Sequence, residues 1–188
     1  MLLALTMKRL EGTKGVWDVL NIWAGVVQKK PQAKLLLIGH GSEATVQRIR
    51  QFIGQNGLKD NIDVYGPVYD FQKKVELLSS SRLFVLPTYE ENWAIVIGEA
   101  LATGLPVICY DLPEIRPVWK DSITWVPKGD QTAFTNTILT LLDDEKARSV
   151  RSSEGKDYVQ RYDWEPIAMN ELEALKATLP HVPGPDSG

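Results

Sequence analysis

The sequence predicts an α/β fold, in which a Rossmann-like parallel sheet of about six strands carries helices on both faces. Strand-like and helix-like segments alternate at least five times along the 188 residues, which is typical of consecutive βα units. The strand candidates are continuous apolar runs, as expected for strands covered on both sides. We therefore expect a ligand-binding domain over residues 1–180, with its site at the carboxyl ends of the strands, and a disordered tail over residues 181–188.

The first half of the chain contains three such units. The first helix shows a core-facing stripe of apolar residues and stops before Pro31. Ser42 and Gly57 flank the second helix as caps, and Gly66-Pro67 closes the third strand. The expected strands lie at 1–7, 34–38 and 62–65, and the expected helices at 16–29, 43–55 and 70–80.

The second half continues the pattern and then becomes helical. Pro87 stops an apolar run, Gly104 caps the helix that follows, and Pro106 prevents that helix from continuing. The expected strands lie at 83–86, 107–110 and 123–126, and the expected helices at 94–103, 131–142, 145–161 and 165–179.

Composition excludes several classes of protein. The formal net charge of −3 and the short charge runs argue against a nucleic-acid-binding surface. Cys109 is the single cysteine and falls in an apolar strand, so we expect a buried side chain and no zinc site with His40 and His181. No run approaches about 20 apolar residues, so we expect no membrane span within the chain and a cytoplasmic location.

Two carboxylates mark the centre of the second half. Glu91 precedes the helix predicted at 94–103, and Glu99 lies within it. The backbone N–H groups of Trp93, Ala94 and Ile95 would be unpaired at the helix start and favour a phosphate. Carboxylates beside an anion site can accept hydroxyls, which a sugar and a ribose supply.

The segment around these residues resembles a known donor-site signature. Glu91-x7-Glu99 followed by Ala-Leu-Ala-Thr-Gly-Leu-Pro-Val is similar to the E-x7-E motif of family-4-type retaining glycosyltransferases of the GT-B fold, the glycosyl transferases group 1. The resemblance implies sugar transfer from a UDP- or GDP-linked donor to an acceptor hydroxyl, with no metal or other cofactor. Glu91 would contact the transferred sugar as a catalytic residue, and Glu99 would bind the ribose.

Arg9 and Lys14 lie in the basic loop after the first strand. An isolated pair of this kind is usually a solvated surface loop. The Arg-Leu-x3-Lys-Gly spacing is also similar to the family's pattern, which implies that both side chains are catalytic and hold the diphosphate. An Arg fork and a Lys charge can together stabilise a pyrophosphate as a leaving group.

Two glycine-containing turns have structural and functional interpretations. Gly39-His-Gly41 is either a tight turn or, as the resemblance implies, a place where the nucleotide or sugar approaches the backbone. These two glycines also resemble the start of a dinucleotide-binding fingerprint, but the acidic residue that such a fingerprint needs further along the chain is not clearly present. Gly66-Pro-Val68 is either a strand-terminating turn or the segment that contacts the base edge through backbone atoms, with Val68 in the site.

The sequence departs from the family pattern around its first glutamate. Asn92 and Ala94 stand where the family usually has glycine, which adds two Cβ atoms and disfavours positive φ. This favours an alternative function, a non-catalytic nucleotide-sugar-binding module or a subunit of a split glycosyltransferase. Half of a nucleotide-sugar epimerase is a third alternative with the same fold.

The resemblance covers only half of an enzyme of this kind. A chain that opens directly on a strand suggests an acceptor domain supplied in cis or in trans. The donor-binding half alone should bind its nucleotide sugar and turn over little. The acceptor would be lipid-linked or a polysaccharide, and the absent domain could place the enzyme at the inner membrane surface.

Overall fold

The computed structural model of the chain describes residues 2–10 and 12–162, with the backbone alone over residues 2–9. The strands are β1 (Leu2–Arg9), β2 (Lys34–His40), β3 (Ile62–Gly66), β4 (Phe84–Leu86), β5 (Val107–Tyr110) and β6 (Thr124–Val126). They form one sheet in the order β3-β2-β1-β4-β5-β6, and every neighbouring pair is parallel. The predicted fold class is confirmed.

Seven α-helices and three 3₁₀ turns connect and cover the strands of the described part of the chain. The helices are α1 (Val16–Lys29), α2 (Glu43–Gln55), α3 (Phe71–Ser79), α4 (Ile95–Ala102), α5 (Arg116–Trp119), α6 (Gln131–Asp143) and α7 (Glu145–Val159). The 3₁₀ turns are η1 (Gly12–Lys14), η2 (Lys120–Ser122) and η3 (Gln160–Tyr162). Side-chain caps stabilise the starts of α2 and α3: Ser42 Oγ accepts from the Thr45 N–H at 3.1 Å, and Asp70 Oδ1 accepts from the Lys73 N–H at 2.6 Å.

The structure differs from the predicted elements at α5 and at the end of β1. The short helix α5 was not expected, because four residues containing Pro117 carry no periodic pattern. Strand β1 runs on to Arg9, where its register with β2 shifts, although charged residues end the apolar run. The helix predicted at 165–179 and the tail at 181–188 lie outside the described residues.

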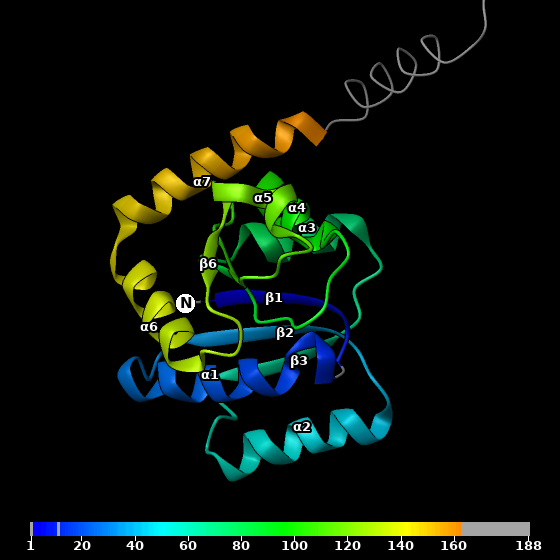
Figure 1. Cartoon of the computed structure of the whole chain (residues 1–188). Helices are drawn as coiled ribbons and strands as arrows, with labels where there is room; N and C mark the ends of the chain where they lie inside the picture. The colour runs from blue at the N-terminus through cyan, green and yellow to red at the C-terminus, as the bar shows by residue number, and fades with distance from the viewer. Residues whose placement is uncertain (1, 11, 163–188) are drawn as a thin grey trace, which may run out of the picture.

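Helices cover both faces of the sheet (Figure 1). One apolar core joins the sheet to α1, α2 and α6, with Trp23 and Phe134 among its fully buried side chains. A second core joins the opposite face to α4 and α5 and contains Trp119 and Leu101. Because an apolar core packs against each face of the sheet, the strands form a rigid scaffold for the loops at their ends.

The turns after β1 and β4 meet at one edge of the sheet. These strands are neighbours although two others intervene in the chain, which makes their boundary the topological switch point. The Tyr89 N–H donates to the Thr13 carbonyl at 3.0 Å, and Gly15 packs on the Pro87 carbonyl. The two turns are therefore tied together by backbone contacts.

Candidate functional site

Lys14 and Glu91 meet where these two turns adjoin. Lys14 Nζ lies 3.2 Å from Glu91 Oε1 and donates to the Glu90 carbonyl at 2.6 Å. Thr88 Oγ1 lies 3.2 Å from the same Glu91 oxygen, within hydrogen-bond distance. The Lys14 and Glu91 side chains are 24% and 17% exposed, so the pair is only partly screened by water. One cation and one carboxylate, far apart in sequence, are thus held at the switch point.

The first turn of α4 starts beside this pair with an unusual backbone. Ala94 adopts φ 56° and ψ 57°, the left-handed conformation that the sequence disfavoured. Ala94 takes this conformation although its Cβ disfavours it, because neighbouring contacts hold this turn. Trp119 Nε1 donates to the Trp93 carbonyl at 2.8 Å, and the two rings pack edge to face at 5.3 Å. Ala94 itself is 6% exposed, so its methyl group is packed within the second core.

This turn gives α4 an N-terminus that can bind an anion. The first N–H groups of a helix have no partner within the helix and carry the positive end of its dipole. Trp93 also packs against Tyr162, with ring centroids 5.1 Å apart, while Ile95 is half exposed. The helix start therefore combines a rigid aromatic base with an accessible first turn.

Glu99 has a partner that the sequence did not single out. Lys74 Nζ on α3 lies 2.8 Å from Glu99 Oε1. We expected Glu99 to need a partner, and Lys74 supplies it from 25 positions away. A signal for Lys74 existed in the sequence: Leu77 and Leu78, three and four positions later, are the buried residues of α3, which puts Lys74 on the inner face.

The remaining predicted residues lie around the same edge. Arg9 is the last residue of β1, in register with His40, and its side chain is outside the described part. The prediction of a turn from Gly39 was wrong, because β2 continues to His40, whose carbonyl accepts from the Leu10 N–H at 2.7 Å. Val68 is half buried and packs on an apolar cluster of Leu36, Ile38 and Leu77.

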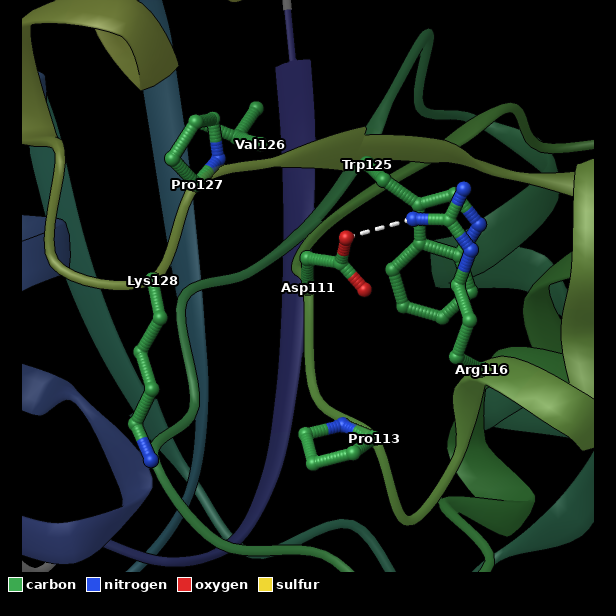
Figure 2. A pocket seen from close by; sticks show the side chains of 7 residues that line it. All are labelled: Asp111, Pro113, Arg116, Trp125, Val126, Pro127 and Lys128. Carbon is green, nitrogen blue, oxygen red and sulfur yellow. Dashed lines mark hydrogen bonds and ion pairs between the residues drawn. The ribbon is translucent and has the colours of Figure 1, made fainter.

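A surface hollow of about 860 Å³ lies at the carboxyl ends of β5 and β6. Figure 2 shows Asp111 pointing toward Arg116, whose guanidinium lies over the Trp125 ring, and Lys128 on the opposite side. Lys128 Nζ is 5.6 Å from the centre of the Tyr89 ring, so the hollow adjoins the turn that carries Glu91. The sequence analysis missed it because it comes from the ends of two short strands.

Asp18 anchors this edge of the sheet to α1. Its Oδ2 accepts from the hydroxyls of Tyr89 at 2.6 Å and Tyr110 at 2.8 Å. Burial and the bond to Asp18 raise the pKa of Tyr110 well above its ordinary value, and the Asp18 bond raises the pKa of Tyr89. Burial also raises the pKa of the Cys109 thiol, so this buried cysteine is no nucleophile.

Two further findings concern the part of the chain that the structure describes. Over residues 2–10 and 12–162, no three His, Cys, Asp or Glu side chains gather closely enough to hold a metal ion. No helix within these ranges has the length and apolar character to cross a bilayer.

The chain is similar to curated sugar transferases. The model of the family glycosyl transferases group 1 matches residues 2–158. A phosphatidyl-myo-inositol mannosyltransferase of Mycobacterium leprae is 31% identical over 160 residues, which cover 84% of this chain and 41% of the relative. A D-inositol 3-phosphate glycosyltransferase of Corynebacterium efficiens is 25% identical over 89% of this chain and 40% of its own length.

The fold is also similar to solved structures. Anabaena HepE in complex with UDP and glucose superposes with a TM-score of 0.83 at 20% identity, covering 94% of this chain and 48% of HepE. Sucrose-phosphate synthase from Thermosynechococcus elongatus superposes with a TM-score of 0.81 at 25% identity, covering 93% of this chain and 45% of the synthase. The chain spans less than half the length of each relative named here.

Proposed function

The chain belongs to the glycosyl transferases group 1 family and has the fold of one half of a GT-B enzyme, and from this premise we propose that it is the donor-binding half of a retaining glycosyltransferase. In this proposal it binds a UDP- or GDP-linked sugar, which then passes to an acceptor hydroxyl. The names of its relatives, which describe mannosyl and other glycosyl transfer, support this class of reaction.

The observation that carries the proposal is the Lys14–Glu91 pair beside the start of α4. A nucleotide sugar presents a diphosphate with hydroxyl-bearing rings on either side. The Lys14 ammonium and the first N–H groups of α4 suit the diphosphate, and the Glu91 carboxylate suits sugar hydroxyls. In the proposal Arg9 adds a second cation, at the end of the neighbouring strand β1.

The reaction breaks the bond between the anomeric carbon and the diphosphate oxygen. Negative charge grows on that oxygen, and the cation and helix dipole stabilise it there, without a metal ion or other cofactor in this proposal. The acceptor oxygen bonds to the same face of the anomeric carbon, and its proton leaves to the departing diphosphate. Glu91 orients the sugar, and Glu99 holds the ribose.

The acceptor half comes in cis or in trans in this proposal, because the chain matches under half of each curated relative's length. A lipid-linked acceptor is supported by the name phosphatidyl-myo-inositol mannosyltransferase. We also propose a cytoplasmic location, at the inner membrane surface when the acceptor half is bound.

A second candidate function is a non-catalytic module that binds the nucleotide sugar for a separate subunit. The exposed Asn92 in place of the usual glycine favours it. Ala94 also replaces a usual glycine, but it is weaker support for this second function, because its backbone still adopts positive φ. Sugar transfer measured after an acceptor half is added would distinguish the two functions. A non-catalytic module binds the donor but does not increase the rate of sugar transfer.

Calorimetric titration with UDP, GDP and ADP tests the proposal. We expect one of them to bind, and Lys14→Ala to weaken it about tenfold or more, the scale of one charged hydrogen bond. Lys59→Ala, at an exposed site after α2, is the matched control. The affinity for inorganic pyrophosphate should fall in Lys14→Ala but not in Glu99→Ala. Equal affinities for all variants would contradict the assigned roles.

A further inference from the structure

The helix α3 carries two adjacent lysines with different surroundings. Lys73 pairs with Glu76 one turn along its own helix, and the side chains of this pair are 40% and 67% exposed. Lys74 instead reaches α4 and pairs with Glu99, with side chains 24% and 30% exposed. The Lys73–Glu76 pair lies on the surface of α3, whereas the Lys74–Glu99 pair joins α3 to α4.

The inner position of Lys74 follows from how α3 is anchored. Leu77 and Leu78 bury one face of this helix, and Lys74 lies on that face because it precedes them by three and four residues. Asp70 caps the helix start with a 2.6 Å bond to the Lys73 N–H. The Lys74 ammonium therefore projects from α3, which is held in place by its cap and its buried leucines, toward α4.

We propose that Lys74 is a positioning residue for nucleotide recognition, which orients the Glu99 carboxylate toward the ribose diol. This rests on the proposed function, in which Glu99 binds the ribose. The ammonium bonds to Oε1 at 2.8 Å, which restrains the side-chain torsions of Glu99. An ionised carboxylate has acceptor sites on both oxygens, so it can still receive two neighbouring hydroxyls.

The opposite role for the pair is competition with the ligand. If Lys74 blocked Glu99, the ion pair would have to open before ribose could bind, and removal of the ammonium would tighten binding. The partial exposure of both side chains favours positioning, and so does Oε2 of Glu99, which receives no hydrogen bond from a described residue. Ribose can therefore be added without breaking the pair.

The test compares ribose-containing and ribose-lacking ligands on the same variants. The probes are the nucleoside diphosphate that the wild-type chain binds most tightly among UDP, GDP and ADP, and its 2′,3′-dideoxy analogue. We expect Lys74→Met to weaken the ribose form about tenfold and the dideoxy form less than about twofold. Lys74→Arg should restore most of the loss, and Lys73→Met should change neither ligand.

The outcomes separate this inference from the function on which it rests. If the wild-type chain binds none of the three diphosphates, the proposed function fails and the role of Lys74 fails with it. If it binds one of them and Lys74→Met loses both forms equally, gains affinity or changes nothing, only the positioning role is overturned. A misfolded variant would lose both forms equally, so a selective loss cannot come from misfolding.

Discussion

Gly15 shows how one residue holds the two site turns together. It has φ 69°, and a Cβ built there would overlap the Pro87 carbonyl oxygen. The two costs combine, since left-handed backbone costs an alanine about 1–2 kcal/mol and overpacking costs typically about 1–3 kcal/mol. Only glycine lets the turn after β1 approach the turn after β4 this closely.

Gly15→Ala should therefore lower the free energy of unfolding by about 2–5 kcal/mol. Gly12→Ala is the control, because a Cβ at Gly12 meets nothing within 4 Å. Urea unfolding of both variants measures the difference. Similar midpoints for the two variants would show that the turns do not press on each other.

The Tyr110 hydroxyl makes stability depend on alkaline pH. Its pKa is raised in the folded state by burial and by the bond to Asp18, so folding favours the protonated phenol. The stabilisation is complete below the ordinary tyrosine pKa of about 10 and is lost as the pH rises through the higher folded value.

Unfolding free energy should fall above about pH 10, and Tyr110→Phe should flatten that fall. At pH 8 the same variant should lose about 1 kcal/mol for its missing hydrogen bond. Tyr69→Phe is the control, since Tyr69 is 88% exposed. Denaturant unfolding between pH 8 and 11 tests this. The account is wrong if all three proteins share one slope.

At the scale of elements, α4 starts at a left-handed residue, Ala94, that is not glycine. Glycine at position 94 would relieve about 1–2 kcal/mol of left-handed strain in the folded state. It would also destabilise the protein by about 0.4–1 kcal/mol, because the unfolded chain gains conformational entropy, and it would remove a buried methyl group. These effects nearly cancel. Valine would add a β-branch that this conformation disfavours and extra volume in a packed core.

We expect Ala94→Gly to stay within about 1 kcal/mol of the wild type and to bind nucleotide normally. Ala94→Val should lose about 2–4 kcal/mol and bind at least about tenfold more weakly, because the first N–H groups of α4 would tilt. Urea unfolding and calorimetry measure both effects. Normal binding by the valine variant would remove the start of α4 from the site.

The elements that the sequence predicts well are those with local signals. The bounds of α1 and α2 match the prediction because apolar spacing and a Ser42 cap specify them. The spacing of Leu77 and Leu78 indicates which face of α3 carries Lys74, but no local pattern identifies the partner of a contact between distant residues. The Lys74–Glu99 pair and the left-handed Ala94 depend on tertiary neighbours, including Trp119, which no local pattern reports.

At the scale of the whole molecule, the order of the strands creates the site. Placing β1 beside β4 brings together turns whose site residues, Lys14 and Glu91, are 77 positions apart in the sequence. The alternation of strands and helices predicts a parallel sheet, and ligands of such sheets bind where the strand order reverses. The side-chain pairing at that point comes only from three-dimensional packing.

The central claim is that a nucleotide sugar lies across the switch point between β1 and β4. A crystal structure of the chain with the tightest-binding nucleotide or its sugar conjugate tests it most directly. The account predicts the diphosphate within hydrogen-bond distance of Lys14 Nζ at the start of α4, and the ribose on Glu99. A ligand seated instead in the hollow of Asp111, Arg116 and Trp125, with Lys14 still bound only to Glu90 and Glu91, would contradict it.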